Sequence, residues 1–464
     1  MRKLLLGAAA AFGATAALAG GAYAQTMPAP AMPKPPANTS YTGMGSLGAP
    51  PSSVMNIPAS GMAAPNSFVV HLNGRLNWYA GVEGSSADNL GGFKSDPYQF
   101  QGYIRLYPGF DAVAANGLQY GVAAEIRMPG SGGGGGHAGT SPGSTSSAET
   151  LYWRRAYGYV GTPDVGTLRF GMGDGIMSLF QTGTFEGFND GAWNGDVEDF
   201  IPSSAIAVYP FSDVGAYYTA DRVVYLSPVF SGFQFGASFT PNSNNLWNGN
   251  CSSAALACNS TSAAPVAGVT ARYRNMVDIG ATYTGTFGPV GMQLGGGYLA
   301  SQTVNYNGVP AAGGARYIGY SFGQFGATLT YAGFTVGGNF VYGNDGGDFS
   351  EQAAGGVDEI AYMLGAQYAA GPFVFGGSYF HTNFDGGWTN ITTGVARTET
   401  DQGIAAGGTY AIAPGMALYL SYLYGLRHQI GWDFYTGSEN TAATPGVGNN
   451  TTAQVFALGT VLKW

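Results

Sequence analysis

The chain has 464 residues, of which 78 are glycine, 14% are aromatic and only 9% are charged. Soluble domains usually carry about 25% charged residues, so this composition argues against an ordinary soluble domain. The formal net charge of −9 also argues against nucleic-acid binding. Few charges with abundant glycine, tyrosine and phenylalanine fit strands that face lipid on one side and a wet interior on the other.

The first 24 residues have the pattern of a secretory signal peptide. Arg2 and Lys3 supply the positive start, a long apolar run follows, and a small-x-small triplet predicts cleavage between Ala24 and Gln25. Later segments lack the roughly 18 apolar residues of a transmembrane helix. The exported chain is therefore expected to be either a secreted β-protein or an outer-membrane barrel.

Residues 25–66 are rich in proline, alanine, methionine and serine. Repeated proline removes backbone donors and favours extended polyproline conformations. We expect a flexible periplasmic arm without a fold of its own. A tether to peptidoglycan or to a partner is the functional alternative.

From Ser67 onward the sequence alternates between apolar and polar residues. In the first predicted strand, Leu72 and Trp78 face one way, while Arg75 and Asn77 face the other. Charged residues fall on the polar face because arginine or lysine facing lipid at mid-bilayer costs roughly 2–4 kcal/mol.

About 16 strands follow from this alternation. They are 67–82, 98–107, 117–128, 150–160, 166–171, 222–227, 232–240, 274–285, 290–302, 321–331, 333–343, 358–369, 372–382, 401–411, 415–428 and 453–464. An even count, short turns that alternate with long loops, and lengths near 9–11 residues are typical of a bacterial membrane barrel. We therefore predict an all-β fold, a transmembrane antiparallel up-and-down β-barrel over residues 67–464.

The insertion at residues 172–221 is too long for a plain hairpin loop and too short for a typical second domain. Loops of this length inside a compact domain are usually functional or disordered.

The segments on either side of this insertion carry a family resemblance. YGYVGTPDVGTLRFG at 157–171 and VVYLSPVFSGFQFGASF at 223–239 resemble hairpin and strand motifs of the trimeric general porins of Gram-negative outer membranes, particularly the alphaproteobacterial kind. The resemblance implies that residues 172–221 form a third loop that folds into the lumen and narrows it. It also implies a homotrimer in outer-membrane lipid and lipopolysaccharide, through which small hydrophilic solutes and ions diffuse passively.

Two details depart from the family pattern or from the alternation. The family's arginine after Phe-Gly is replaced by Met172. Arg155 shares the apolar parity of Trp153, Tyr157 and Tyr159. We expect Arg155 either at the interfacial girdle or, as the preferred alternative, against a neighbouring protomer, because the family's protomer contact uses the early strands.

Charged residues predict a pore constriction. Arginines of the polar parity gather on the early strands, at Arg75, Arg105, Arg127, Arg154, Arg169 and Arg222. The densest acidic group in the insertion contains Asp196, Glu198 and Asp199. A basic wall facing an acidic loop would orient dipolar solutes. The alternative is that these are ordinary lumen charges, some paired and some solvated. The acidic net charge hints at mild cation preference, although local charges override it.

Two further features belong to export and assembly. Cys251 and Cys258 lie close together in a polar stretch, and in an oxidising compartment they are expected to form a disulfide that closes a small loop. At the C-terminus, one face of the last strand ends on an aromatic residue and resembles the insertion signal of outer-membrane barrels. That face contains Phe456, Leu458, Leu462 and Trp464.

We expect no enzymatic activity, no cofactor and no metal, because the four histidines show no metal-ligand spacing and no nucleophile or phosphate-loop motif is present. A substrate-selective channel, for example for sugars, and a plugged structural or adhesive barrel are the alternatives to a passive-diffusion porin.

Overall fold

The computed structural model describes residues 64–89, 96–127, 151–211, 220–242, 273–303, 318–347, 351–387, 397–440 and 446–464. The predicted signal peptide, nearly all of the 25–66 arm, and Cys251 and Cys258 lie outside these ranges. No helix within the described ranges is both long and apolar enough to cross a membrane.

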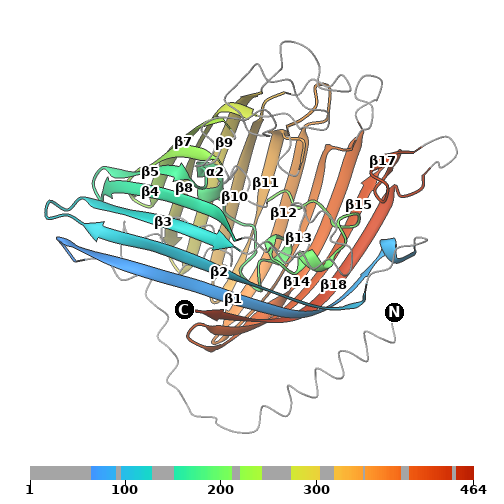
Figure 1. The fold of residues 1–464 in the computed structure, drawn as a ribbon, viewed down its shortest axis with the longest axis horizontal. Helices are drawn as coiled ribbons and strands as arrows, with labels where there is room; N and C mark the ends of the chain where they lie inside the picture. The colour runs from blue at the N-terminus through green and yellow to red at the C-terminus, as the bar shows by residue number, and fades with distance from the viewer. Residues whose placement is uncertain are drawn as a thin grey trace, which may run out of the picture. The chain divides into compact units, whose positions relative to one another are not determined.

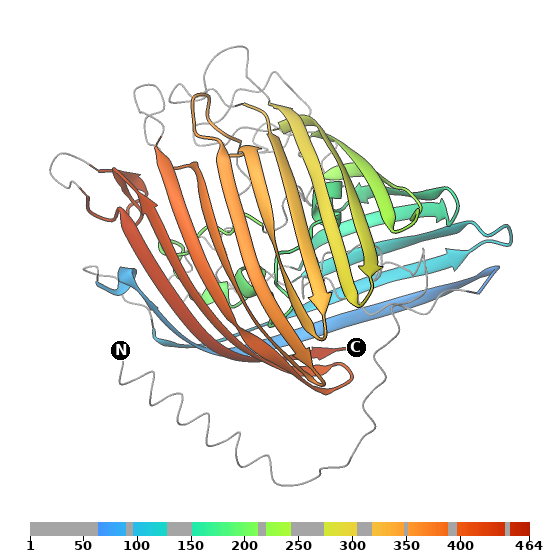
Figure 2. The same cartoon turned by 180° about the vertical axis from the view of Figure 1, so that it is seen from behind.

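Sixteen strands close into one antiparallel barrel, and this confirms the predicted up-and-down fold. Neighbours in the wall follow chain order from β1 to β15, and β18 pairs with both β15 and β1 to complete the ring. Figures 1 and 2 show the same order as a continuous change of colour around the wall. Closure leaves no unpaired sheet edge, which hydrocarbon could not satisfy.

The barrel strands are β1 (Ser67–Ser85), β2 (Tyr98–Val113), β3 (Gln119–Arg127), β4 (Tyr152–Thr162), β5 (Gly166–Met172), β6 (Asp221–Leu226), β7 (Phe233–Asn242), β8 (Tyr273–Phe287), β9 (Val290–Thr303), β10 (Ser321–Tyr331), β11 (Phe334–Asn344), β12 (Glu359–Ala370), β13 (Phe373–Asp385), β14 (Thr398–Ala413), β15 (Met416–Gln429) and β18 (Asn450–Lys463). The short strands β16 (Trp432–Asp433) and β17 (Ser438–Glu439) pair separately. The helices are η2 (Ser86–Asn89), α2 (Ile176–Leu179), η3 (Ala192–Asn194) and η4 (Glu198–Phe200).

The two faces of the wall follow the predicted alternation. On β1, Leu72 and Trp78 are 60% and 45% exposed on the outer face, whereas Arg75 and Tyr79 are 3% and 0% exposed on the inner face. Successive side chains of a strand point to opposite sides, so apolar residues cover the outside while polar ones line the interior.

A β-bulge changes this alternation in β4. Glu125 of β3 pairs with Arg155, and the next residue of β3 pairs with Trp153, so Arg154 is the extra residue. A bulge reverses the facing of the residues beyond it. Arg155 is therefore buried inside the barrel at 6% exposure, and the expectation that it lies at the girdle or against another protomer is wrong.

The same bulge turns two tyrosines inward. Tyr159 is 5% exposed and donates a hydrogen bond to the carboxylate of Asp111. Tyr157 lies beneath the guanidinium of Arg169, which points inward from β5. Parity with Trp153 predicts an outward position for both tyrosines, and one extra residue in the strand overturns that prediction.

The last residue of the chain takes part in closing the ring. Gly74 of β1 and Trp464 exchange two backbone hydrogen bonds, each 3.1 Å long. The indole lies over Gly74, where an added methyl group would stand 2.3 Å from a ring carbon of Trp464. Because glycine has no side chain, Gly74 leaves room for the terminal aromatic ring.

The segment between β5 and β6 packs against the inner face of the wall. Its helix α2 buries Ile176 and Leu179 against Val224 and Leu226 of β6, which explains two apolar residues at inward positions. Further along, the buried rings of Phe188, Trp193 and Phe200 join one apolar cluster with Tyr79 of β1 and Phe380 of β13.

Candidate functional site

Each of six consecutive strands contributes an inward arginine that the alternation predicts. We call this row the arginine wall; it consists of Arg75 (β1), Arg105 (β2), Arg127 (β3), Arg154 (β4), Arg169 (β5) and Arg222 (β6). Arg75 is the direct cross-strand partner of Arg105, and Arg105 of Arg127. Like charges directly opposite one another destabilise a sheet, so the row requires nearby negative groups.

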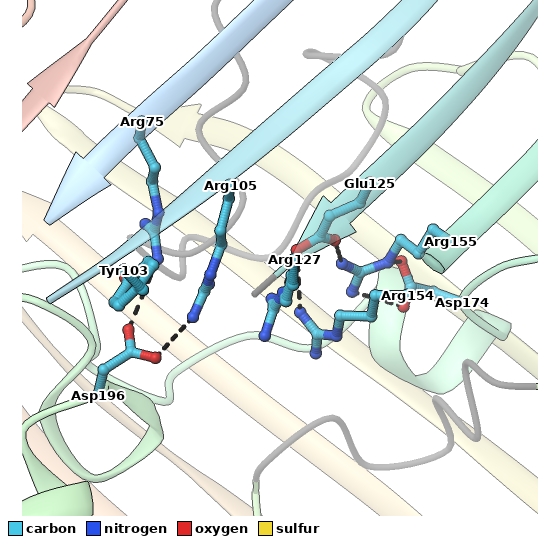
Figure 3. Close-up of polar contacts among 9 residues, drawn as sticks. All are labelled: Arg75, Tyr103, Arg105, Glu125, Arg127, Arg154, Arg155, Asp174 and Asp196. Carbon is cyan, nitrogen blue, oxygen red and sulfur yellow. Dashed lines mark hydrogen bonds and ion pairs between the residues drawn. The ribbon is translucent and has the colours of Figure 1, made fainter. Parts of the chain in front are cut away.

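Asp196 from the 172–221 segment neutralises the first part of the wall. Its carboxylate lies 2.6 Å from Nη2 of Arg105 and 3.8 Å from Nη2 of Arg75 (Figure 3). Tyr103 stands beside the same pair: its hydroxyl accepts a hydrogen bond from Arg75, and the guanidinium of Arg105 lies 4.3 Å from its ring centre. The site therefore joins β1, β2 and the segment.

Glu125 organises the second part of the wall. Its carboxylate pairs with Arg127 and Arg155, and Nη1 of Arg154 lies 3.7 Å away (Figure 3). Arg155 in turn donates two parallel hydrogen bonds, of 2.7 and 2.8 Å, to Asp174 at the start of the segment. Bidentate pairs of this kind fix geometry as well as charge.

The two other predicted acids lie in different surroundings. Asp199 accepts a 3.0 Å hydrogen bond from Nε2 of Gln101 on β2, so it stays near the wall. Glu198 instead interacts electrostatically with Tyr209 of the same segment. The structure thus brings Asp196 and Asp199 to the arginines of the wall.

The remaining two arginines stand apart from these acids. Arg169 lies 5.3 Å from the ring centre of Tyr157. Arg222 is close enough to Asp278 of β8 to interact with its charge. The predicted set of site residues therefore divides into a cluster around Asp196, a cluster around Glu125, and two flanking arginines.

Burial and neighbouring charges set different pKa values within one short turn. Burial would raise the pKa of Asp196, but Arg105 and Arg75 outweigh burial and hold it below its ordinary value. Burial and then the charge of Asp196 raise the pKa of Asp199 to about 7. Burial likewise raises the pKa of Asp190 to about 6 despite the favourable charge of Arg75. The acidic side of the site is therefore only partly ionised near neutral pH.

Several residues of the site are missing from the sequence-based set. Glu125 has the inward parity and lies two residues before Arg127, so its position next to a cation is a usable signal. Arg155 is signalled by two adjacent arginines in a strand that otherwise alternates. Gln101 and Asp174 carry no such signal, because their roles depend on where the segment lies.

The sequence of this barrel matches a known protein family over most of its length. The sequence model described as "Gram-negative porin" matches residues 8–427. The chain belongs to the Gram-negative porins. Among curated proteins, none matches this chain. As a porin, the protein is an outer-membrane channel for passive diffusion.

The chain is similar to several solved structures at low sequence identity. The anion-selective porin from Comamonas acidovorans is 14% identical, with a TM-score of 0.50 over 86% of this chain and 100% of that one. A mutant porin of Rh. blastica is also 14% identical, with a TM-score of 0.47 over 85% of this chain and 100% of that one. OmpT of Vibrio cholerae, in its trimer form, is 14% identical, with a TM-score of 0.47 over 86% of this chain and 99% of that one. At these identities the likeness concerns the fold alone.

Proposed function

We propose that this porin passes small hydrophilic solutes and ions through an aperture bordered by the arginine wall and the 172–221 segment. The observation that carries the proposal is Asp196, an acid of the segment held between Arg75 and Arg105 on two wall strands. Fixed charges that border a narrow, poorly polarisable passage create a strong local field. Such a field favours small, dipolar, hydrated solutes over apolar ones.

Conductance across a planar bilayer tests this function. Large ohmic steps with weak ion selectivity are expected from the wild-type protein. Saturation of the current by one sugar would indicate the substrate-selective alternative. Correctly folded protein without any conductance would indicate a plugged structural barrel and would contradict the proposal.

The acidic side of the aperture has its own test. Combined Asp196→Asn, Glu198→Gln and Asp199→Asn changes remove negative charge from the segment, so the reversal potential in a salt gradient should shift toward anion preference. The control removes the same number of acids at exposed positions, with Asp96→Asn, Asp164→Asn and Glu439→Gln. Equal shifts of the reversal potential in the two variants would show that Asp196, Glu198 and Asp199 do not line the constriction.

The proposal also includes a homotrimer in outer-membrane lipid and lipopolysaccharide, exported with removal of residues 1–24. An open groove of about 680 Å³ on the wall between β3 and β7 supports a protomer contact at the early strands; its lining includes the outward side chains Val122, Phe170 and Phe239. Native mass spectrometry of the purified protein should give three chains per particle, each beginning at Gln25. A monomer beginning at Met1 would contradict both expectations.

A further inference from the structure

Glycines on the inner face of the barrel lie directly beneath the segment that follows β5. We call these residues the glycine track; it consists of Gly236 (β7), Gly295 (β9), Gly326 (β10), Gly365 (β12), Gly376 (β13), Gly403 (β14), Gly425 (β15) and Gly81 (β1). At each of them an added methyl group would stand less than 3 Å from an atom of the segment. The segment therefore occupies the space that side chains would fill elsewhere on the wall.

The track and the segment run in the same order. Ile176 meets Gly236, Phe180 meets Gly295 and Thr182 meets Gly326. Further along the segment, Phe185, Phe188, Trp193 and Phe200 meet the glycines of β12, β13, β14 with β15, and β1, in that order. Because this is also the order of the strands around the barrel, the segment follows the inner circumference instead of touching the wall at one point.

Further along the segment, aromatic rings pack directly on the glycines. A methyl group at Gly365 would lie 2.3 Å from Cγ of Phe185, and one at Gly376 would lie 2.6 Å from Cγ of Phe188. Trp193 occupies two positions at once, because methyl groups at Gly403 and Gly425 would both come within 2.6 Å of its indole. Real Cβ atoms do not approach neighbours so closely, so alanine at these positions requires the segment or the wall to move.

Hydrogen bonds attach the segment at intervals between the rings. Asn339 of β11 donates from Nδ2 to the carbonyl oxygen of Thr182 at 2.7 Å, and Thr409 of β14 donates to the carbonyl oxygen of Phe188 at 3.0 Å. Trp193 Nε1 donates to the backbone oxygen of Ile404 at 3.1 Å. The first two bonds provide partners for backbone carbonyls of the buried segment.

Backbone conformation indicates that the fit constrains the segment. Phe185 has φ of 46° and Ala192 has φ of 51°, in the left-handed region that favours glycine. Non-glycine residues persist there when the surrounding structure over-determines them. The seating of Phe185 on Gly365 supplies that constraint at the first of these positions.

We propose that the glycine track is a set of positioning residues that holds the segment against the wall from β7 to β1 and thereby fixes the width of the remaining aperture beside the arginine wall. This inference rests on the proposed function for its effect on conduction. The position of the segment can nevertheless be measured without conduction.

The test measures the accessibility of a buried residue in the segment. Thr184 is 0% exposed, and Thr184→Cys in a Cys251→Ser, Cys258→Ser background gives one reactive thiol. We expect a water-borne maleimide to label this thiol slowly. With Gly365→Ala added, labelling should become roughly tenfold faster, because overpacking of a filled site makes the seated state less favourable.

The matched control is Gly323→Ala on the outer face of β10, where a methyl group would have no neighbour closer than 3.6 Å. This control should leave the labelling rate unchanged. Replacing Phe185 with alanine should reduce the effect of Gly365→Ala, because the ring that the methyl group meets is gone. Equal labelling rates in Gly365→Ala and Gly323→Ala would overturn the inference.

Two further measurements keep the outcome decisive. If Gly365→Ala does not fold, the comparison is made with Gly376→Ala, whose methyl group would stand 2.6 Å from Cγ of Phe188, a less severe contact than the 2.3 Å at Gly365. Single-channel conductance of the folded track variants should differ from that of Gly323→Ala. If Gly365→Ala speeds labelling but the wild-type protein shows no conductance, the proposed function is contradicted, while the result still supports the role of the glycine track in positioning the segment. If the track variants change the labelling rate but conduct like Gly323→Ala, the glycine track does not set the width of the aperture.

Discussion

Asp199 is the residue of the site whose charge changes most readily near neutral pH. It lies in the same short turn as Asp196 and accepts its hydrogen bond from Gln101. Burial and the charge of Asp196 raise its pKa to about 7. The carboxyl is therefore ionised above pH 7 and neutral below it, whereas Asp196, with its lowered pKa, stays ionised throughout this range.

We predict that ion selectivity depends on pH through this residue. Acidification from pH 8 to pH 6 removes negative charge from the aperture, so the reversal potential in a salt gradient should move toward anion preference. Asp199→Asn should abolish most of the shift, and a small part should remain from Asp190, whose pKa of about 6 is lower. A full shift in Asp199→Asn would assign the titration to another group.

Arg155 has a different role, because it connects the wall to the start of the segment. It holds Asp174 through two hydrogen bonds and also pairs with Glu125, and all three side chains are less than 8% exposed. Removing one partner of a buried ion pair leaves the other charge without compensation, at a cost of about 3–5 kcal/mol.

Arg155→Ala should therefore lower the free energy of unfolding by about 3 kcal/mol. Arg155→Lys keeps the charge but loses the planar fork, so its loss should be smaller. Urea unfolding in detergent, followed by the mobility change of the barrel on gels, measures both variants. If Arg155→Ala has the same free energy of unfolding as the wild type, Arg155 does not form these ion pairs.

At the scale of elements, the sequence predicts strands better than it predicts their irregularities. All sixteen strands appear where alternation places them, because lipid outside and polar groups inside impose a period of two on each strand. The bulge in β4 is different. One extra residue at Arg154 exchanges the faces of Tyr157 and Tyr159, and a parity argument carried across that point gives the wrong side.

The contacts of the segment could not be predicted from local pattern. Asp196 lies more than 90 positions from Arg105 in the chain, and Phe185 is about twice as far from Gly365. Gly365 is recognisable as an inward residue of a predicted strand, yet its role depends on which part of the segment lies above it. Sequence therefore indicates the charges and the wall, while the path of the segment requires the structure.

The closing strand gives a prediction of its own. Trp464 pairs with Gly74 through its backbone and covers that glycine with its ring. Trp464→Ala should lower the yield of barrels that show heat-dependent mobility after refolding into detergent, because the ring that covers Gly74 across the last seam is lost. Trp464→Phe should keep most of the yield. Equal yields for Trp464→Ala and Trp464→Phe would show that the aromatic ring has no role in barrel closure.

For the whole molecule, function depends on which side of the closed wall faces water. Leu329 of β10 is 47% exposed on the outer face, and its neighbour Thr328 has the inward parity. Apolar side chains such as Phe325 and Tyr331 share the outer face with Leu329. The outer face therefore contacts hydrocarbon and the inner face contacts the aqueous channel.

Single cysteines test this sidedness in lipid vesicles, in a background without Cys251 and Cys258. Thr328→Cys should react with a water-borne, membrane-impermeant reagent, whereas Leu329→Cys should be protected. After solubilisation in denaturant, both should react equally, which controls for intrinsic reactivity. The reverse pattern in vesicles would exchange inside and outside and contradict the channel.

The agreement in order between the glycine track and the segment has a consequence for how this porin can vary. Outer loops of a barrel usually accept insertions and deletions because little depends on their spacing. Between Phe185 and Phe200, each ring lies on particular glycines of the wall, so adding or deleting a single residue would shift every later ring off its glycine. Across related chains, this stretch should therefore keep a constant length even where its individual residues differ.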